Sequence, residues 1–486
     1  MNHCNLKVQY QATTQWVEVT AHGFLIAAYQ KAKSQGCFRQ LEKVLDVKMK
    51  TVRYSPSDKG ATLWASLVVG CEHTVEINDK LGAHEPAAAA ALLGWERFPD
   101  QSGVNRWLWA VQPKQVTAWR QMHLDLLCDQ TRARARSRWL RLVKGERLLA
   151  IDLDQRALVV SGRHYELATP GYFGRKRGRL GYQLSAAFRG GRIGEVLEEY
   201  CDSGSTPLAH RIEDLLGSLD RFCARTGIRP HQVLVRGDGQ LGTPANIAKL
   251  QAHGYHFLFQ GLSPARAHAL ARQVPAETIF WRVENGAERL PRWMADLGWR
   301  EPASTSGEGP VIRAGTLLLA RQEWAPPPKR GGKTTRAKQA LEPRPTVIKF
   351  DSYLTDWSPE PLPVAAVLPT YDDRGTMERY CCDEPYALGA KHVRTHHYEG
   401  AALFQWLVAT TNNLLRWLQH STFRRTELEQ LGLGRLIHQV MQIPARIHRW
   451  GQKWIIEVPQ QHHLVKQLLK SWPQLTLAPD LALAPG

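Results

Sequence analysis

Four acidic side chains stand in the sequence where buried strands and a helix are expected. Asp152 and Asp154 lie two residues apart in the strand-like run 147–160, so both side chains leave the same face of that strand. Asp238 follows the apolar run VLV, and Glu378 lies within YDDRGTMERY. Acids on an otherwise apolar strand are costly unless something compensates them. These residues are therefore the candidates for a reactive site.

Three acids from two strands and a helix can hold two divalent cations on one phosphate. Mg²⁺ prefers hard oxygen ligands and takes few of them from protein, the rest coming from water and phosphate. Two such ions about 3.5–4 Å apart can activate an attacking oxygen and stabilise a leaving one. Taken singly, each acid is better explained as a helix cap or a surface salt bridge. Taken together, and in this order, they predict a metal site.

Two polar residues accompany the last acid. Tyr371, Arg374 and Glu378 fall at positions i, i+3 and i+7, which predicts that they share one face of a helix. An arginine is suited to bidentate contacts with phosphate.

The overall charge indicates a polyanionic partner. The chain has 486 residues, with 63 Lys+Arg against 45 Asp+Glu and a net charge of +18. Nucleic acid is the usual partner of such a protein, since neutralising phosphates releases condensed counterions. No run approaches the roughly 18–20 apolar residues that cross a bilayer, and the N-terminus lacks a signal pattern. The eight cysteines include no Cys-x2-Cys pair, so we expect reduced thiols in a cytoplasmic protein.

Basic and histidine-rich segments are candidates for phosphate contacts. A solvated helix face is the alternative for TRARARSRWLR (131–141), and a surface loop is the alternative for GRKRGR. HVRTHHYEG can bind a metal, but a surface or phosphate-facing cluster is favoured. The residues concerned are Arg132, Arg134 and Arg136 in the first segment, Arg175, Lys176, Arg177 and Arg179 in the second, and His392, His396 and His397 in the third.

Periodicity changes along the chain and divides it into regions. The helix former EPAAAAALLGW (85–95) ends at Gly94, and Asp100 or Ser102 can cap the helix that follows it. This pair, joined by a Gly-containing turn, is compatible with a helix-turn-helix; an ordinary helical packing domain is the alternative. Strands first, then alternating helix and strand, predict an α/β layer with a mixed sheet. The predicted regions are a helical N-terminal DNA-binding domain (1–145), the first part of the core (146–262), a β-rich insertion (263–370), the last part of the core (371–425), and a C-terminal region (426–486) with a hairpin over RIHRWGQKWIIEV.

The sequence resembles the DDE insertion-sequence transposases of the ribonuclease H-like, retroviral-integrase superfamily, in particular members with a β-rich insertion. The most specific match is Tyr371-x2-Arg374-x3-Glu378. Further matches are Asp154 on the first strand, GYQLSAAF on the next, and Asp238 at a strand end before a helix. FPDQSGVNRWL and NNLLRW also agree, and the resemblance covers about residues 20–470.

The resemblance implies a ribonuclease H-like mixed-sheet core that a β-rich insertion interrupts, with a mainly helical N-terminal DNA-binding domain. It implies that Asp154, Asp238 and Glu378 are the catalytic residues and metal ligands, with Asp152 in reserve as the first acid. Two Mg²⁺ ions (Mn²⁺ possible) would serve each site, and Tyr371 and Arg374 would position phosphates. The expected reaction is cut-and-paste transposition: hydrolysis at transposon ends, then strand transfer into target DNA. The expected protein is bacterial and nucleoid-associated, binds double-stranded DNA, and forms a homodimer on it.

The sequence departs from the family pattern at two places. The family has a Lys seven residues after the Glu, where this chain has Pro385; Lys391 is the candidate substitute. Gln155 and Arg156 follow the first acid, where small or hydroxyl residues are usual. These departures support one alternative, a domesticated DNA-binding protein that keeps the fold without catalysis. A general ribonuclease H-like nuclease, which would cut without end specificity, is a further alternative.

Overall fold

The structure is a computed structural model of the chain. The residues that it describes are 7–13, 20–34, 36, 44, 46–50, 53–83, 87–133, 140–141, 147–173, 176, 178–191, 193–261, 264–283, 291–300, 315–324, 346–357, 362–450, 453–459, 462–464, 467–468 and 470.

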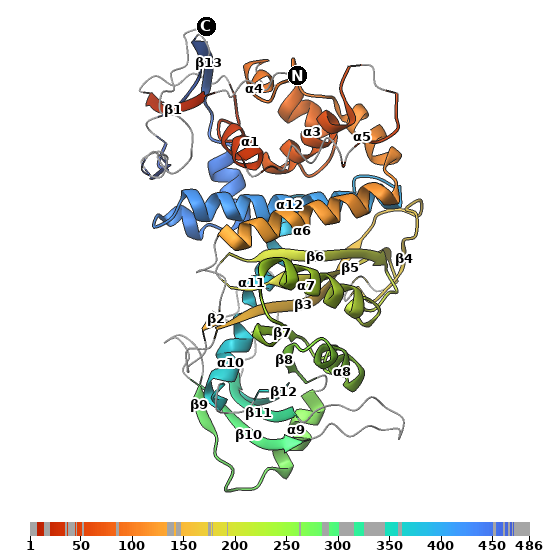
Figure 1. Cartoon of the computed structure of the whole chain (residues 1–486), viewed down its shortest axis with the longest axis vertical. Helices are drawn as coiled ribbons and strands as arrows, with labels where there is room; N and C mark the ends of the chain where they lie inside the picture. The colour runs from red at the N-terminus through yellow and green to blue at the C-terminus, as the bar shows by residue number, and fades with distance from the viewer. Residues whose placement is uncertain are drawn as a thin grey trace, which may run out of the picture.

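A mixed sheet of eleven described strands runs through the lower part of the molecule (Figure 1). Its order is β4-β5-β3-β7-β8-β12-β11-β10-β9, with β6 also paired to β5 and β2 to β3. The strands are β2 (Leu140–Arg141), β3 (Arg147–Val159), β4 (Thr169–Pro170), β5 (Leu180–Arg189), β6 (Glu195–Ser203), β7 (Val233–Gly237), β8 (His256–Gln260), β9 (Trp281–Val283), β10 (Arg292–Arg300), β11 (Gly315–Trp324) and β12 (Val347–Thr355). The predicted α/β class with a mixed sheet is confirmed.

Alternation along β3 separates an apolar face from a face that carries the acids. Leu149, Ile151 and Leu153 belong to the main hydrophobic core, whereas Asp152 and Asp154 point to the opposite side. Capping residues set the end of one and the start of the other of the two α-helices that follow along the chain. Gly227 takes a left-handed conformation (φ 69°) after α7 (Ile212–Thr226), and Thr243 caps α8 (Pro244–Ala252).

The segment predicted as an insertion continues the central sheet. β12 pairs antiparallel with β8, and β11, β10 and β9 follow it outward. The described part also contains a helix at each end, α9 (Pro264–Gln273) and the start of α10 (Val364–Asp372). The strands were expected, but their hydrogen bonding to β8 was not, because the sequence does not show which strands pair.

The N-terminal region is mainly helical, as predicted. It contains α1 (Leu25–Ser34), α3 (Pro56–Val68), η1 (Asn78–Ala83), α4 (Ala87–Leu92), α5 (Gln101–Ala110) and α6 (Pro113–Ala133). α12 (Tyr398–Thr422) lies with α6 between these helices and the sheet (Figure 1), and is buried along most of its length. One hydrophobic cluster contains buried residues of these helices and of the sheet, the first being Phe24 and the last Leu468. The helices therefore share their core with the sheet. None of the described helices is both long and apolar enough to span a membrane.

The first helix of the possible helix-turn-helix is α4, and its predicted second helix is divided into α5 and α6, which pack into this core. Asp100 caps α5, as expected. The Trp119 indole of α6 donates to Thr410 Oγ1 at 3.0 Å, and His123, which is fully buried, contacts Thr410 Oγ1 at 2.8 Å. A recognition helix must expose one face to a DNA groove. α6 buries one face against α12 and β6 and exposes Lys114, Thr117 and Gln121 on another, so DNA binding by this region stays a prediction beside the packing alternative.

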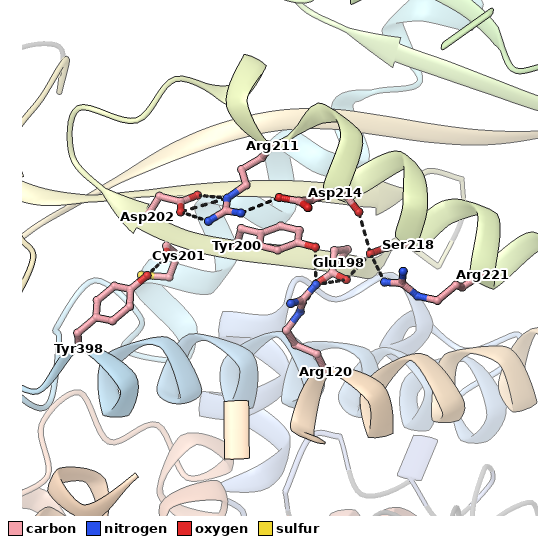
Figure 2. A network of polar contacts seen from close by, with 10 residues as sticks. All are labelled: Arg120, Glu198, Tyr200, Cys201, Asp202, Arg211, Asp214, Ser218, Arg221 and Tyr398. Carbon is pink, nitrogen blue, oxygen red and sulfur yellow. Dashed lines mark hydrogen bonds and ion pairs between the residues drawn. The ribbon is translucent and has the colours of Figure 1, made fainter. Parts of the chain in front are cut away.

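A polar network fixes the edge strand β6 to its covering helices (Figure 2). Arg120 of α6 donates two hydrogen bonds of 3.0 Å to the Glu198 carboxylate and lies over the Tyr200 ring. Ser218 of α7 donates to Glu198 at 2.6 Å, and Arg211 forms an ion pair with Asp202 at 2.6 Å. These contacts compensate the buried charges of Glu198 and Asp202 and tie β6 to α6 and α7, because an arginine lost from either acid would leave its charge buried without that partner.

The two ends of the described chain meet in a second sheet. β13 (Arg446–Trp450) and β14 (Lys453–Pro459) form the predicted antiparallel hairpin. β1 (Lys7–Thr13) adds to it in parallel, with Lys7 opposite Lys453. This pairing was not predicted.

The buried His22 makes stability depend on pH. Burial lowers its pKa from 6.5 to about 4, so the unfolded chain binds a proton there that the folded chain does not. The free energy of unfolding therefore falls as the pH drops from about 6.5 to 4, by about 3 kcal/mol for this residue. We expect the His22→Gln variant to show a correspondingly flatter pH dependence in urea unfolding. Parallel curves for both proteins would contradict this assignment.

Candidate active site

Asp154 and Asp238 come together at one edge of the sheet. β3 and β7 are parallel neighbours, with Asp152 opposite Arg236 and Leu153 opposite Gly237. One residue further along each strand, Asp154 and Asp238 therefore lie side by side where β7 ends. Both are partly exposed, and the Asp154 side chain retains 32% of its accessible surface. The backbone N–H of Gln155 donates to Asp154 Oδ1 at 2.8 Å, and that of Gln240 donates to Asp238 Oδ1 at 3.0 Å.

The electrostatic environment of Asp154 suits a positively charged ligand. Burial raises the pKa of Asp154 above its usual range, and the Arg374 guanidinium opposes that rise. The negative charges of Asp238 and Asp152 raise it further. A cation bound beside Asp154 would offset both the burial of this carboxylate and its repulsion by the neighbouring acids.

Asp152 has a different role from Asp154, because it is fully buried and both its oxygens accept hydrogen bonds from one arginine. The two hydrogen bonds come from Arg236, Nε to Oδ1 at 2.7 Å and Nη2 to Oδ2 at 2.9 Å. Gly190 makes room for this pair, since a Cβ there would lie 2.5 Å from Arg236 Nη2. The geometry favours Asp154 over Asp152 as the first acid.

The helix expected over Tyr371–Glu378 is broken in the middle, so those residues do not share one helical face. α10 ends at Asp372 and α11 (Gly375–Ala387) begins at Gly375. Arg236 Nη1 donates to the Thr370 carbonyl, which in a continuous helix would accept the Arg374 N–H. The Arg374 N–H instead donates to the Tyr371 carbonyl at 3.0 Å. Arg236 therefore fixes both Asp152 and the helix junction.

Tyr371 and Arg374 are buried at this junction and contact the sheet. Arg374 Nη1 donates to Tyr371 Oη at 2.8 Å, and Nη2 donates to Asp154 Oδ2 at 3.2 Å. Tyr371 Oη lies 3.3 Å from the Gly237 carbonyl oxygen. In this state both side chains orient the first acid, so their predicted contacts with phosphate stay a prediction.

Glu378 lies one turn further along, in the first turn of α11. Its side chain is exposed, and within the described part of the chain its carboxylate makes no hydrogen bond or ion pair. An acid is favourable at this end of a helix, because the helix dipole is positive there. Its carboxylate is thus available to an incoming ligand, although no direct contact joins it to Asp154 or Asp238.

Comparison with known proteins identifies the family. The family model described as Transposase DDE domain group 1 matches residues 6–478, almost the whole chain. The chain belongs to the DDE transposase family. It is therefore a DNA transposase, an enzyme that cleaves DNA and transfers strands with the help of divalent metal ions. No curated protein matches the sequence. Among solved structures, the chain is similar to the piggyBac transposase in its synaptic complex with hairpin DNA, at 10% identity, a TM-score of 0.42, and coverage of 86% of this chain and 80% of that chain.

The donor set of the transposase fits the divalent ion that its family uses. Asp154 and Asp238 present carboxylate oxygens next to each other, as hard cations such as Mg²⁺ and Mn²⁺ require. Both are partly open to solvent, which leaves space for water and phosphate as further ligands. Glu378 is the remaining predicted ligand and stands free at the start of α11.

The basic residues predicted to contact DNA are only partly described. Arg132 is exposed and forms an ion pair with Asp129, which is compatible with the solvated helix face. Lys176 and Arg179 are exposed near β5, as a backbone-tracking loop requires. Arg134, Arg136, Arg175 and Arg177 lie outside the described residues.

The histidines of HVRTHHYEG separate into two places. His392 Nε2 lies 3.1 Å from Glu72 Oε2, and burial followed by the charge of His73 lowers its pKa. The His396 and His397 rings lie near Trp109, with centroids 6.5 and 6.4 Å away. The three predicted histidines therefore do not form one cluster.

The candidate substitute for the family's lysine is placed elsewhere. Lys391 Nζ lies 3.5 Å from Glu72 Oε2, beside His392 and not beside the acids of β3 and β7. Pro385 lies within α11. Lys391 therefore does not take the place of the family's lysine in this structure.

Gln155 and Arg156 serve the fold, which accounts for their departure from the family pattern. Gln155 Nε2 donates to Ser185 Oγ at 2.9 Å. Arg156 forms an ion pair with the fully buried Glu199 at 3.3 Å, and Tyr380 Oη of α11 donates to the same carboxylate at 3.3 Å. No ion-pair role was predicted for Arg236, Arg156 or Glu199. The available signal was an arginine within an apolar strand beside a buried acid.

Proposed function

We propose that the transposase cuts DNA at the ends of its own element with Mg²⁺ held by Asp154, Asp238 and Glu378, and then joins the freed 3′-hydroxyl to target DNA. The parallel pairing of β3 with β7 is the observation that carries this proposal, because it brings two carboxylates to one edge of the sheet. Bound Mg²⁺ supplies an activated water and neutralises charge that develops on the phosphate.

The residues around the acids give each a defined task. Arg374 donates to Asp154 Oδ2. The other oxygen, Oδ1, accepts only the Gln155 N–H among the described residues, so it keeps a lone pair for a ligand. Tyr371 orients Arg374, and Arg236 holds the junction in front of the acids. The guanidinium of Arg374 also lies beside the position a phosphate would take, so it can lend positive charge to that phosphate.

The sheet supports a ribonuclease H-like core as part of this proposal. The neighbours β6, β5 and β3 are antiparallel, and β3, β7 and β8 are parallel. We infer a homodimer on DNA, since two ends must be brought together for excision, and the net charge of +18 suits contact with both.

A cleavage assay tests the proposal. The substrate is a labelled duplex that carries one element end, with a duplex of shuffled end sequence as control, each incubated with Mg²⁺ or with EDTA. We expect metal-dependent cleavage at the end junction, followed by joining to a supercoiled plasmid. End-specific binding without cleavage would identify an inactive DNA-binding protein. Equal cleavage of both duplexes would identify a general nuclease.

Glu378 has its own prediction. We expect Glu378→Gln to lower end cleavage by more than about 100-fold, because loss of even an outer partner of a metal site costs 10–100-fold. Binding to end DNA should be retained, as measured by mobility shift. The matched control is Glu277→Gln, an exposed acid outside the site. Near-normal cleavage by Glu378→Gln would remove this residue from the ligand set.

A further inference from the structure

A cluster of metal-ligating side chains exists apart from the acids of β3, β7 and α11. Glu72, His73 and His392 each offer one ligand atom, and the three atoms all lie within 4.8 Å of one another. Glu72 and His73 follow α3, whereas His392 stands 320 positions after Glu72, between α11 and α12. We propose that Glu72, His73 and His392 form a zinc-binding site that joins the N-terminal helices to the segment leading into α12.

The distances between the side chains are close to those of a bound ion. His392 Nε2 and Glu72 Oε2 are 3.1 Å apart, and the His73 and His392 rings have centroids 4.2 Å apart at 48°. Ligands at about 2.0–2.1 Å from a tetrahedral Zn²⁺ are about 3.3 Å apart. The Glu72–His392 separation therefore already fits, and His73 is exposed, so its ring can turn to complete the set.

Close backbone packing and side-chain hydrogen bonds hold the two segments together without any ligand. Gly389 has φ +61°, and a Cβ there would lie 2.8 Å from both the Cys71 carbonyl oxygen and the Glu72 Cα. Glu76 Oε1 accepts the N–H groups of Glu72 at 3.1 Å and His73 at 2.9 Å. Arg394 Nη1 donates to Ser66 Oγ at 2.9 Å. Ligands on such a fixed frame lose little conformational entropy when they bind an ion.

The donor types select zinc over the ion of the active site. Two imidazoles and one carboxylate suit Zn²⁺, whereas Mg²⁺ prefers oxygen ligands alone. Three protein ligands leave a fourth position for water. The cluster and the carboxylates of the active site therefore require different metals, and each can be measured without the other.

Lys391 opposes the binding of a cation. Its Nζ lies 3.5 Å from Glu72 Oε2, the same oxygen that contacts His392. A carboxylate has two oxygens, so Glu72 can contact both an ion and the lysine, but the positive charge disfavours the ion. Removing this charge should therefore strengthen zinc binding.

Zinc titration of the purified full-length protein, without DNA or Mg²⁺, tests the proposal. Competition with a chromophoric chelator should give one equivalent of bound Zn²⁺. We expect His73→Ala and His392→Gln each to weaken binding more than about tenfold, and Lys391→Met to tighten it severalfold. His231→Ala, at an exposed histidine elsewhere, is the matched control and should bind as the wild type does.

Folding of each variant is checked by circular dichroism, so that loss of zinc is not confused with unfolding. Lys391→Met guards against the same confusion, because it predicts a gain. Zinc binding that is equal in the wild type and the Glu72→Gln/His73→Ala/His392→Gln variant would overturn the proposal, as would an unchanged affinity of Lys391→Met. Because no DNA is present, neither result depends on whether the transposase cuts element ends.

Discussion

Asp154→Asn and Asp238→Asn should each abolish cleavage of element ends while leaving the protein folded, and Asp154→Asn should be at least as stable as the wild type. Loss of cleavage follows because an amide is a poor replacement for a carboxylate ligand of a hard cation. We expect a fall of more than about 1,000-fold, above the 10–100-fold cost of altering an outer partner of a metal site. Single-turnover cleavage of labelled end DNA measures it.

Stability should change in the opposite direction from activity. Burial and the neighbouring acids raise the pKa of Asp154, so its charge disfavours folding at neutral pH. Asn removes that charge, and the free energy of unfolding of Asp154→Asn in urea at pH 7 should equal or exceed the wild-type value. The matched control is Asp46→Asn, an exposed aspartate outside the site, which should cleave normally. A variant with normal cleavage would remove that aspartate from the site, and a strongly destabilised one would give it a structural role.

Arg236→Met should be among the most destabilising single substitutions in the described structure. It leaves the buried Asp152 with Arg374 at 3.8 Å in place of its two hydrogen bonds from Arg236, and it frees the Thr370 carbonyl, so we expect a loss of about 3–5 kcal/mol in the free energy of unfolding. Cleavage should fall as well, because the α10–α11 junction loses its hold on the sheet. Urea unfolding followed by circular dichroism measures the first effect.

A double-mutant cycle separates the ion pair from a general loss of packing. Arg236→Met combined with Asp152→Leu removes both charges and should recover a large part of the stability that Arg236→Met loses, without restoring cleavage. The matched control is the exposed pair Arg53–Glu96, joined at 2.5 Å against 2.7 Å for Arg236–Asp152, where Arg53→Met should cost far less stability. Equal costs at Arg236 and Arg53 would show that burial of the Asp152 pair does not matter.

The sequence predicted those features that local patterns determine. The strand-like run 147–160 and the apolar run VLV before Asp238 predicted β3 and β7 near their observed bounds, and the Asp100 cap predicted the start of α5. That Asp154, in the middle of β3, and Asp238, directly after β7, belong to one site was also predicted, from the residue type and the order of the acids along the chain.

Features that depend on distant contacts were not predictable in the same way. The choice between Asp152 and Asp154 depends on the strand register that places Arg236 opposite Asp152. The break between α10 and α11 depends on the same arginine, because it takes the Thr370 carbonyl from the helix. The burial of α6 depends on α12, which follows it by more than 260 residues. Periodicity along one segment contains none of this information.

The parallel pairing of β1 with β14 also determines when the protein can finish folding. Residues 7–13 are made first, yet their partner strand spans residues 453–459. At a synthesis rate of about 5–20 residues per second, the first strand leaves the ribosome about 20–90 s before its partner exists. α1 and α3 face a similar delay, since they pack against α12. The nascent transposase therefore keeps the partner-facing apolar surfaces of α1 and α3 uncovered until α12 has been made, and these early elements complete their packing late in assembly.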